Sequence, residues 1–286
     1  MDLGLKGVHV LITGASGGIG LTTTKEYLAQ GAKVTAHYNS NNTSLAPLLS
    51  SHPDTLQALQ ADVTREPAVA RLFADAQASF GPVQVLVVNH GISPEPGVPL
   101  ADISFERWRK TLTVNLDAVF LVTREYLRAL RTAGEAEKAK ASVILVGSTA
   151  GQFGLAGQAD YASAKSAMMY GLTLSLKNEI VKIAPRGRVI AIAPGWVWTP
   201  MAEAQLGQEP ERMYRALATM PLKKIAIAED IATQIVIASS SKVSGHVSGQ
   251  IITIAGGMEG RLLNHPDELA KERAGWAELS EHGFNV

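Results

Sequence analysis

The sequence has 286 residues, of which 46% are apolar, and its 26 basic residues balance its 26 acidic ones. This length and apolar content suit one substantial α/β domain, which we expect to span residues 1–258. A net charge of zero excludes a general electrostatic field that would draw the chain to nucleic acid or to an anionic membrane. The absence of cysteine excludes disulfides, thiolate catalysis and cysteine-based zinc sites, and we expect no metal.

Apolar runs of strand length recur along the chain, and segments with helical spacing separate them. The runs lie at Val8–Ile12, Lys33–His37, Leu56–Gln60, Val83–Val88, Ser142–Val146, Arg188–Ile192 and Ile251–Ile254. Because strands that are apolar on both faces suit a parallel sheet covered by helices, the pattern predicts a doubly wound α/β fold. The first run is too short for a signal peptide or a membrane span, so we expect a cytosolic protein.

A glycine-rich stretch follows the first run directly and leads into a helical segment that reaches Gln30. Glycines at such a junction let the backbone turn tightly, and the helix N-terminus offers N–H groups to a phosphate. The spacing is G-x-x-x-G-x-G rather than G-x-G-x-x-G, but its place between a strand and a helix suits a dinucleotide. The predicted cofactor contacts here are Gly14, Ser16, Gly18, Ile19 and Gly20. A glycine-rich turn without a ligand is the alternative.

The second run ends in polar residues where the adenosine ribose of a dinucleotide would lie. A carboxylate at this point would bind the ribose 2′-hydroxyl and repel a 2′-phosphate, and none occurs before Asp54. The side chains present instead are hydrogen-bond donors, and they are His37, Tyr38, Asn39 and Ser40. The sequence therefore favours NADP(H), although NAD(H) is possible because no basic residue stands here. An ordinary polar turn is the alternative.

Asx residues close the third and fourth runs, where open α/β sheets bind their ligands. We expect Asp62 with Val63 to contact the adenine and Asn89 with Gly91 to frame the ribose. Either Asx side chain can instead satisfy loop backbone, as these residues often do.

Tyr161 and Lys165 stand one helical turn apart if residues 160–183 form a helix, so that their side chains share a face. A nearby ammonium favours a phenolate and lowers the ordinary phenol pKa of about 10. Ser148 follows the fifth run and can hold a substrate oxygen where Tyr161 exchanges a proton with it. Taken alone, a Tyr-x-x-x-Lys pair is more often a solvated helix face.

Asn115 interrupts a strongly apolar helical pattern, and an amide at a buried position needs hydrogen-bond partners. It marks either a functional water site or a satisfied core amide, and the residues alone favour the core amide.

The sixth run leads into a Pro-Gly turn, which would place the following residues over the cofactor. The predicted cofactor contacts here are Pro194, Gly195, Val197 and Thr199, and the predicted substrate pocket contains Gln152, Phe153, Trp196, Trp198 and Met201. Residues 199–226 have weak periodicity, which suggests a partly helical lid or an ordered surface segment.

These features, in this order, resemble the short-chain dehydrogenase/reductase family. The residues that carry the resemblance are Thr13-Gly14-x-x-x-Gly18-x-Gly20, Asp62-Val63, Asn89-x-Gly91, Asn115, Ser148, Tyr161-x-x-x-Lys165 and Pro194-Gly195. The chain looks most similar to the branch of 3-oxoacyl carrier-protein reductases and related carbonyl reductases. The resemblance implies a Rossmann-type sheet of order 3-2-1-4-5-6-7 that binds NAD(H) or NADP(H).

By the same resemblance, Tyr161 is the general acid or base and Lys165 lowers its pKa while holding the nicotinamide ribose. Ser148 orients the substrate oxygen, and Asn115 holds a water that relays protons through Lys165. His90 departs from the family pattern, in which alanine is common before the glycine, and we assign it no role.

The leading hypothesis is an NADP-dependent reductase of ketones or dehydrogenase of secondary alcohols. The alternatives are a nucleotide-binding regulatory protein without turnover and an NAD-dependent alcohol dehydrogenase of the same family. The set Asn115, Ser148, Tyr161 and Lys165 favours the enzyme, because a sensor does not need a proton-transfer group beside an ammonium.

The resemblance also implies a homo-oligomer, most simply a tetramer. Small residues at Ala164, Ala167, Gly171 and Ser175 would let a second helix approach closely, or would let this helix pack on its own sheet. The extension over residues 259–286 has a helix start near Pro266 and an apolar side with Trp276, so we expect a docked helix.

Overall fold

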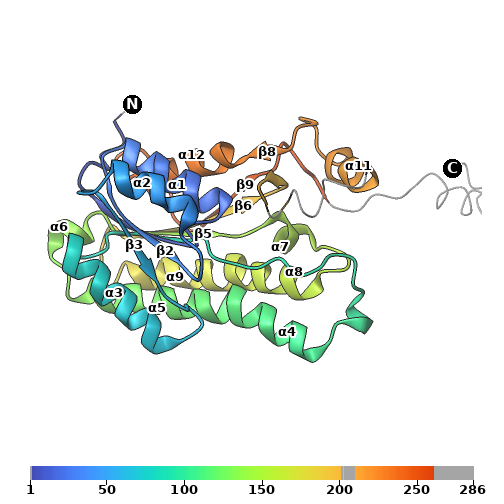
Figure 1. The fold of residues 1–286 in the computed structure, drawn as a ribbon, viewed down its shortest axis with the longest axis horizontal. Helices are drawn as coiled ribbons and strands as arrows, with labels where there is room; N and C mark the ends of the chain where they lie inside the picture. Colours follow the sequence, from blue (N-terminus) through green and yellow to red (C-terminus); the bar gives the residue numbers. More distant parts are fainter. Residues whose placement is uncertain (1, 201, 203–209, 261–286) are drawn as a thin grey trace, which may run out of the picture.

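A parallel sheet lies at the centre of the molecule, as the computed structural model shows for residues 2–200, 202 and 210–260 (Figure 1). The sheet has seven strands in the order β3-β2-β1-β4-β5-β6-β9. Its strands are β1 (His9–Thr13), β2 (Lys33–Tyr38), β3 (Leu56–Gln60), β4 (Val85–Val88), β5 (Ser142–Val146), β6 (Arg188–Pro194) and β9 (Gln250–Ile254).

The order of this sheet confirms the predicted doubly wound topology. Strand β1 is buried along its whole length, and its Val10 lies opposite Val34 of β2 on one side and Val85 of β4 on the other. The strand that follows β6 in the sheet is β9, because the short strands β7 (Val197–Trp198) and β8 (Ala226–Ile227) pair with each other instead. All described pairings in the main sheet are parallel, so the carboxyl ends of its strands meet along one edge.

Helices cover both faces of the sheet (Figure 1). One layer holds α1 (Gly18–Ala29), α2 (Ala46–Ser51) and α12 (Ala228–Ser239), and the other holds α3 (Glu66–Phe80), α4 (Phe105–Leu112), α5 (Ala118–Arg131), α8 (Ala159–Ser166) and α9 (Thr173–Ile180). The remaining described helical segments are η1 (Thr43–Leu45), η2 (Leu100–Asp102), η3 (Thr113–Asp117), α6 (Glu135–Lys138), α7 (Thr149–Phe153), η4 (Ala167–Leu172) and α11 (Pro210–Ala218).

Two hydrophobic clusters hold these layers on the sheet. Tyr27 of α1 is fully buried on one face, and its hydroxyl donates to Ser239 at the end of α12 at 2.7 Å. Phe73 of α3 and Tyr126 of α5 are buried on the other face. Burial of both faces explains why the strands read as continuous apolar runs rather than as alternating ones.

The helix predicted over residues 160–183 extends from α8 to α9 and contains a π-helical segment, η4. A second π segment, η3, contains Asn115 and joins α4 to α5. Single π turns inside α-helices occur frequently at functional sites. The periodicity of the sequence predicts the helix. It does not predict the extra residue per turn that makes η4 a π-helical segment.

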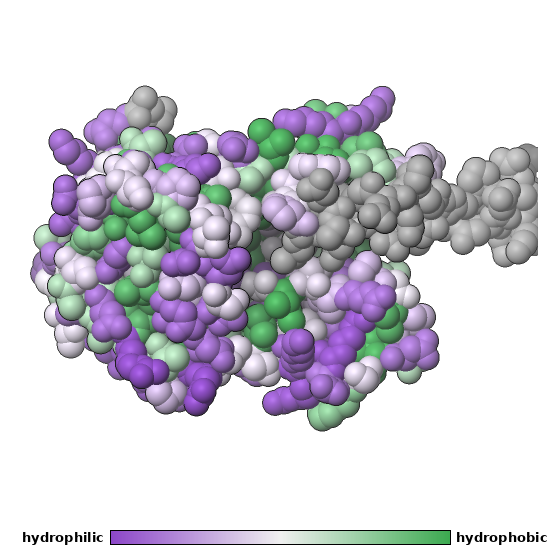
Figure 2. Space-filling model, in the orientation of Figure 1, coloured by the Kyte–Doolittle hydropathy of each residue, from purple (hydrophilic) through white to green (hydrophobic). Residues whose placement is uncertain are grey.

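The segment predicted as a lid carries its own small cluster of packed side chains. Ala202 and Ala216 are buried, and Trp196 and Ile225 pack against them. Figure 2 shows that apolar residues gather over β8 and α11 on the face drawn there. Met201, residues 203–209 and the predicted helix within 261–286 lie outside the described residues. Lid closure therefore stays a prediction.

No helix in the described part of the chain is long and apolar enough to span a membrane.

A buried arginine ties the first residue of β6 to the end of α12. Arg188 is 3% exposed, and its guanidinium donates to the carbonyl oxygens of Ala238, Ser239 and Ser244 at 2.7, 2.6 and 3.1 Å. The last carbonyls of a helix lack partners within the helix and carry partial negative charge. Arg188 therefore satisfies the C-terminal end of α12 inside the protein.

Replacing Arg188 with methionine should destabilise the fold by roughly 2–4 kcal/mol, because buried carbonyl oxygens lose their donor. The matched control is Arg186→Met, two residues earlier and exposed, for which we expect a change within about 0.5 kcal/mol. Urea unfolding followed by circular dichroism measures both. Equal midpoints for the two variants would contradict this assignment.

Candidate active site

The loop between β1 and α1 is shaped by close backbone contacts. Gly14 has φ +64°, a left-handed conformation that favours glycine. A Cβ on Gly18 would lie 2.8 Å from Cγ2 of Thr199, and a Cβ on Gly20 would collide with the Gly14 carbonyl oxygen. Gly17 begins α1 with an extended backbone. The predicted glycine spacing is therefore required by packing, and it brings the N-terminus of α1 to the edge of the sheet.

His37 fixes this loop from the end of β2. Its Nδ1 accepts a hydrogen bond from the Gly14 N–H at 3.2 Å, and its Nε2 lies 2.9 Å from the Ala61 carbonyl oxygen. Since a carbonyl only accepts, the ring carries its proton on Nε2. Burial lowers the pKa of His37, so the ring is neutral. We expected His37 to donate to a ribose or phosphate, but both ring nitrogens are engaged by backbone groups.

The polar residues after His37 lie at the open side of a cavity along the carboxyl edge of the sheet, which is described below. Asn39, Ser40 and Asn41 line it and are exposed. Asp62, at the end of β3, also lines it, and its Oδ1 accepts from the N–H and the hydroxyl of Thr64 at 3.0 and 2.6 Å. The hydroxyl of Thr64 holds the pKa of Asp62 below its usual value, although burial opposes this shift. Asp62 is thus ionised and also caps its own loop.

Asn89 and His90 join the end of β4 to the glycine loop. The Asn89 amide donates to the carbonyl oxygens of Thr13 and Gly14 at 3.1 and 3.0 Å. Thr13 Oγ1 accepts from the N–H groups of Asn89 and His90, and its hydroxyl donates to the Val87 carbonyl oxygen at 3.4 Å. The same oxygen lies 2.8 Å from His90 Nδ1. Burial lowers the pKa of His90 to about 3, so this ring is also neutral.

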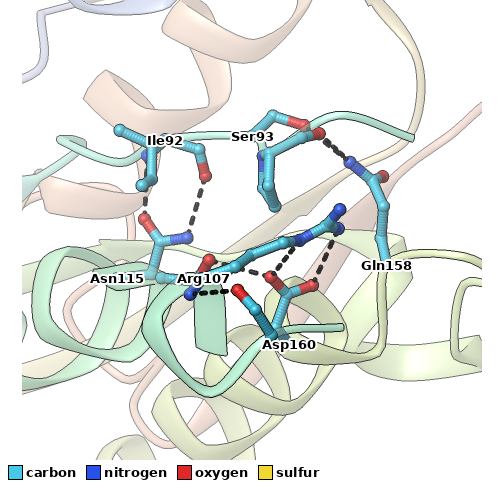
Figure 3. A network of polar contacts seen from close by, with 9 residues as sticks. Ile92, Ser93, Arg107, Asn115, Gln158 and Asp160 are labelled. Atoms are coloured by element: carbon cyan, nitrogen blue, oxygen red, sulfur yellow. Dashed lines mark hydrogen bonds and ion pairs between the residues drawn. The ribbon is translucent and has the colours of Figure 1, made fainter. Parts of the chain in front are cut away.

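Asn115 holds the loop that follows Gly91 (Figure 3). Its Oδ1 accepts from the Ile92 N–H and its Nδ2 donates to the Ile92 carbonyl oxygen, both at 2.8 Å. The side chain is fully buried. The amide is therefore satisfied by backbone, as the residues alone favoured, and a water held at Asn115 stays a prediction.

Ser148, Tyr161 and Lys165 meet at the end of β5. Ser148 begins α7, and its Oγ accepts from the Ala150 N–H at 3.1 Å. Lys165 Nζ donates to the Val146 carbonyl oxygen at 2.9 Å and lies 5.8 Å from the centre of the Tyr161 ring. Burial lowers the pKa of Lys165 to about 8. The predicted turn of helix thus places the phenol, the amine and the serine in the lining of one cavity.

One cavity of about 900 Å³ runs along the carboxyl edge of the sheet. The predicted residues that line it are Gly14, Ser16, Gly18, Ile19, His37, Asn39, Ser40, Asp62, Val63, Asn89, Gly91, Ser148, Tyr161, Lys165, Pro194, Gly195, Trp196, Val197 and Thr199. The volume and the elongated lining suit a dinucleotide with a small molecule beside it.

Three residues predicted for the substrate pocket do not line this cavity. Gln152 Oε1 accepts a hydrogen bond from Thr253 Oγ1 at 2.9 Å, while Phe153 and Trp198 are 36% and 41% exposed. Two predicted cofactor residues, Gly20 and Tyr38, are also outside the lining, and Gly20 acts through packing instead. The short α7 turns its side chains away from the cavity after Ala150.

The comparisons with known proteins agree with this site. A model of the short chain dehydrogenase family matches residues 8–210. The chain belongs to this family. It is therefore an NAD(P)-dependent oxidoreductase of C=O and CH–OH groups.

Similar members of the family come from bacteria. The chain is 31% identical to a 3-oxoacyl-[acyl-carrier-protein] reductase of Mycobacterium avium over 87% of this chain and 89% of that protein. It is 29% identical to a 3-oxoacyl-[acyl-carrier-protein] reductase of Salmonella typhimurium over 90% of this chain and 99% of that protein. The crystal structure of a glucose/ribitol dehydrogenase from Brucella melitensis superposes with a TM-score of 0.79 at 29% identity, covering 90% of this chain and 99% of that one.

The family's nicotinamide dinucleotide fits the residues present. Gly18 and Gly20 leave no room for a Cβ, and the start of α1, at Gly18 and Ile19, lines the cavity end where a pyrophosphate would bind. Ser148, Tyr161 and Lys165 line the other end.

Sequence reasoning missed several residues on the substrate side of the cavity, namely Ile92, Ser93, Lys110, Val114, Leu155 and Gln158. Gln158 is 3% exposed, and its Nε2 donates to Ser93 Oγ at 3.2 Å and to the Pro94 carbonyl oxygen at 2.5 Å (Figure 3). Its position just before α8, three residues ahead of Tyr161, was a usable signal.

Proposed function

We propose that this protein is an NADP(H)-dependent ketone reductase, or secondary-alcohol dehydrogenase, in which Tyr161 is the general acid and base. The observation that supports this most is the meeting of Ser148, Tyr161 and the buried amine of Lys165 in the cavity that also contains the glycine loop. When bound, a nicotinamide would supply or receive the hydride. The chain itself must then orient the carbonyl and deliver one proton to its oxygen.

Tyr161 delivers that proton in the direction of reduction. The Ser148 hydroxyl uses its oxygen to accept from Ala150 and keeps its proton for the substrate oxygen. The Lys165 ammonium, anchored on Val146, stabilises the phenolate that remains after proton transfer. Hydride on carbon and proton on oxygen together convert the ketone into the secondary alcohol.

The environment of Tyr161 favours an enzyme over a regulatory nucleotide-binding protein. Burying an ammonium costs stability, as the lowered pKa of Lys165 reflects, and no carboxylate among the described residues forms an ion pair with it. That cost has a physical reason if the charge stabilises a phenolate during turnover.

The substrate side of the cavity favours a ketone with an apolar body. Ile92, Leu155 and Trp196 contribute apolar surface, while Ser93 and Gln158 are hydrogen-bonded to each other. Small 3-oxo esters are the first substrates to test, because similar proteins are 3-oxoacyl-[acyl-carrier-protein] reductases. A cytosolic site of action and one domain over residues 1–258 remain predictions.

A homo-oligomer is supported by an apolar stripe on the outer face of the helix formed by α8, η4 and α9. Tyr170 and Leu174 are 41% and 37% exposed there. The predicted small residues Ala167, Gly171 and Ser175 are exposed on this face, whereas Ala164 is buried. This surface suits a second copy of the helix, with tetramer the state proposed.

Replacing Tyr161 with phenylalanine should lower kcat by about 10²–10⁴-fold, because the proton-transfer group is lost. The dissociation constant for NADPH should stay within about threefold of the parent value, since the ring remains. The control is Tyr170→Phe, which removes an exposed phenol hydroxyl further along the helix. NADPH absorbance with ethyl acetoacetate, cyclohexanone and acetophenone measures turnover. Parent-like turnover by Tyr161→Phe would refute the mechanism.

NADPH should bind more tightly than NADH, because no carboxylate stands at the end of β2. Asn39→Asp adds a carboxylate at an exposed cavity position with little change in shape. We expect its dissociation constant for NADPH to rise roughly tenfold with that for NADH little changed. Asn42→Asp, exposed but outside the cavity lining, is the control. Fluorescence titration measures the constants of all three proteins for both cofactors, and tighter NADH binding by the parent protein would contradict the cofactor assignment.

Sedimentation of the parent protein should give a mass well above the 30.3 kDa of one chain at micromolar concentration. Leu174→Glu should reduce this mass, because it places charge in the stripe. Val243→Glu changes a similarly exposed apolar residue elsewhere and should not. A monomeric parent protein would exclude the proposed assembly.

A further inference from the structure

A partly buried ion pair lies beside Tyr161, because Asp160 directly precedes it in the chain. Asp160, in the first turn of α8, is fully buried. Its Oδ2 accepts from Arg107 Nε at 3.0 Å and from the Thr111 hydroxyl at 2.9 Å, and Arg107 Nη2 lies 3.4 Å from Oδ1 (Figure 3). Both partners come from α4, so the carboxylate joins two helices that pack against each other.

The same carboxylate also receives the backbone N–H of Tyr161. Burial raises the pKa of Asp160, but the hydrogen bonds from Arg107, Thr111 and this N–H more than offset that effect and hold the pKa below its usual value. Asp160 is therefore ionised. An anion in the first helical turn also interacts favourably with the helix dipole.

We propose that the Arg107–Asp160 pair is a positioning device for Tyr161, which fixes the first turn of α8 and keeps the charge beside the phenol balanced. This inference depends on the proposed role of Tyr161 as general acid and base. Arg107 and Asp160 do not line the cavity, so neither touches substrate. Their influence passes through the backbone of α8 and through the electric field at the phenol.

The charge balance gives the pair a signature that packing alone does not have. If Asp160 becomes neutral, the Arg107 cation is left uncompensated and favours the deprotonated state of nearby acids. If Arg107 becomes neutral, the Asp160 anion is left uncompensated and favours the protonated state. Each change should move the proton affinity of the site by roughly half a pH unit, in opposite directions.

Other ionisable groups near Tyr161 would respond with the same sign. Lys165 lies on the same helix, and neutral His90 interacts with it from the end of β4. From the elements packed on α8, helix α4 adds Lys110 at the cavity and η3 adds the exposed Asp117, while α7 has no ionisable side chain. An added positive charge lowers the pKa of a phenol and of an ammonium alike, so the direction does not depend on which group dominates the profile.

The experiment measures the pH dependence of NADPH oxidation with the fastest ketone of the three tested above. Reduction needs protonated Tyr161, so kcat/KM should fall as pH rises through the apparent pKa. We expect Asp160→Asn to move this fall to lower pH and Arg107→Gln to move it to higher pH. The double variant should return to the parent midpoint with a lower rate.

Two further variants separate charge from packing. Arg107→Lys keeps the charge but loses the fork that contacts Asp160, so we expect a parent-like midpoint with kcat lowered several-fold. Arg109→Gln removes an exposed cation from the same helix and should leave rate and midpoint unchanged. If the single variants do not fold, Arg107→Lys and the double variant still test the proposal, because both keep the pair neutral overall.

Shifts in the same direction, or no shift in folded single variants, would overturn the proposal. A changed midpoint in Arg107→Lys, or in the double variant, would overturn the charge-balance part of it. These outcomes differ from failure of the proposed function, in which Tyr161→Phe would retain turnover or no ketone would be reduced.

Discussion

The architecture of the candidate active site depends on the buried position of the Lys165 amine at the end of β5. Its hydrogen bond to the Val146 carbonyl, at 2.9 Å, is the contact that fixes it there, and burial lowers its pKa to about 8. An ammonium in such a place costs free energy, so the helix that carries it must be held rigidly against the sheet. Two glycines let this helix pack closely against the end of β5. A Cβ on Gly151 would lie 2.6 Å from the Ser166 nitrogen, and one on Gly147 would collide with Met169.

The loop that follows β4 is held by side chains that bind its backbone. Asn115 binds both the N–H and the carbonyl oxygen of Ile92 (Figure 3). Gln158 donates to the Pro94 carbonyl oxygen. These contacts fix the path of the loop after β4, and Gln158 also lines the cavity. The same side chain therefore helps to set both the shape of the substrate side and the chemistry of its surface.

Local signals were sufficient to predict the fold and the grouping of Ser148, Tyr161 and Lys165. Apolar runs fix the strands, and helical spacing fixes the relation between Tyr161 and Lys165. The sequence could not predict the role of His37, because its partners are backbone groups of Gly14 and Ala61 that only the folded sheet brings to the ring.

The sequence could not predict contacts between residues that are distant in the chain, for the same reason. Arg107 and Asp160 are 53 positions apart, and nothing in either local pattern distinguishes them from exposed helix residues. Burial is the deciding information, and it becomes visible only when α4 packs against α8. The substrate-pocket predictions for Gln152, Phe153 and Trp198 relied on position after a strand, which does not fix the direction of a side chain in a short helix or edge strand.

The charge within the cavity differs from that of the whole chain. Among its described lining residues, Lys110 and Lys165 are cationic and Asp62 is anionic, which leaves one net positive charge, 2 − 1 = +1. His37 and His90 line it as neutral rings, and Asp160 is compensated by Arg107 outside it. The N-terminus of α1 adds partial positive charge at the glycine loop. A chain with zero net charge thus presents a locally positive cleft to an anionic dinucleotide, because its buried carboxylate is paired and its buried imidazoles stay neutral.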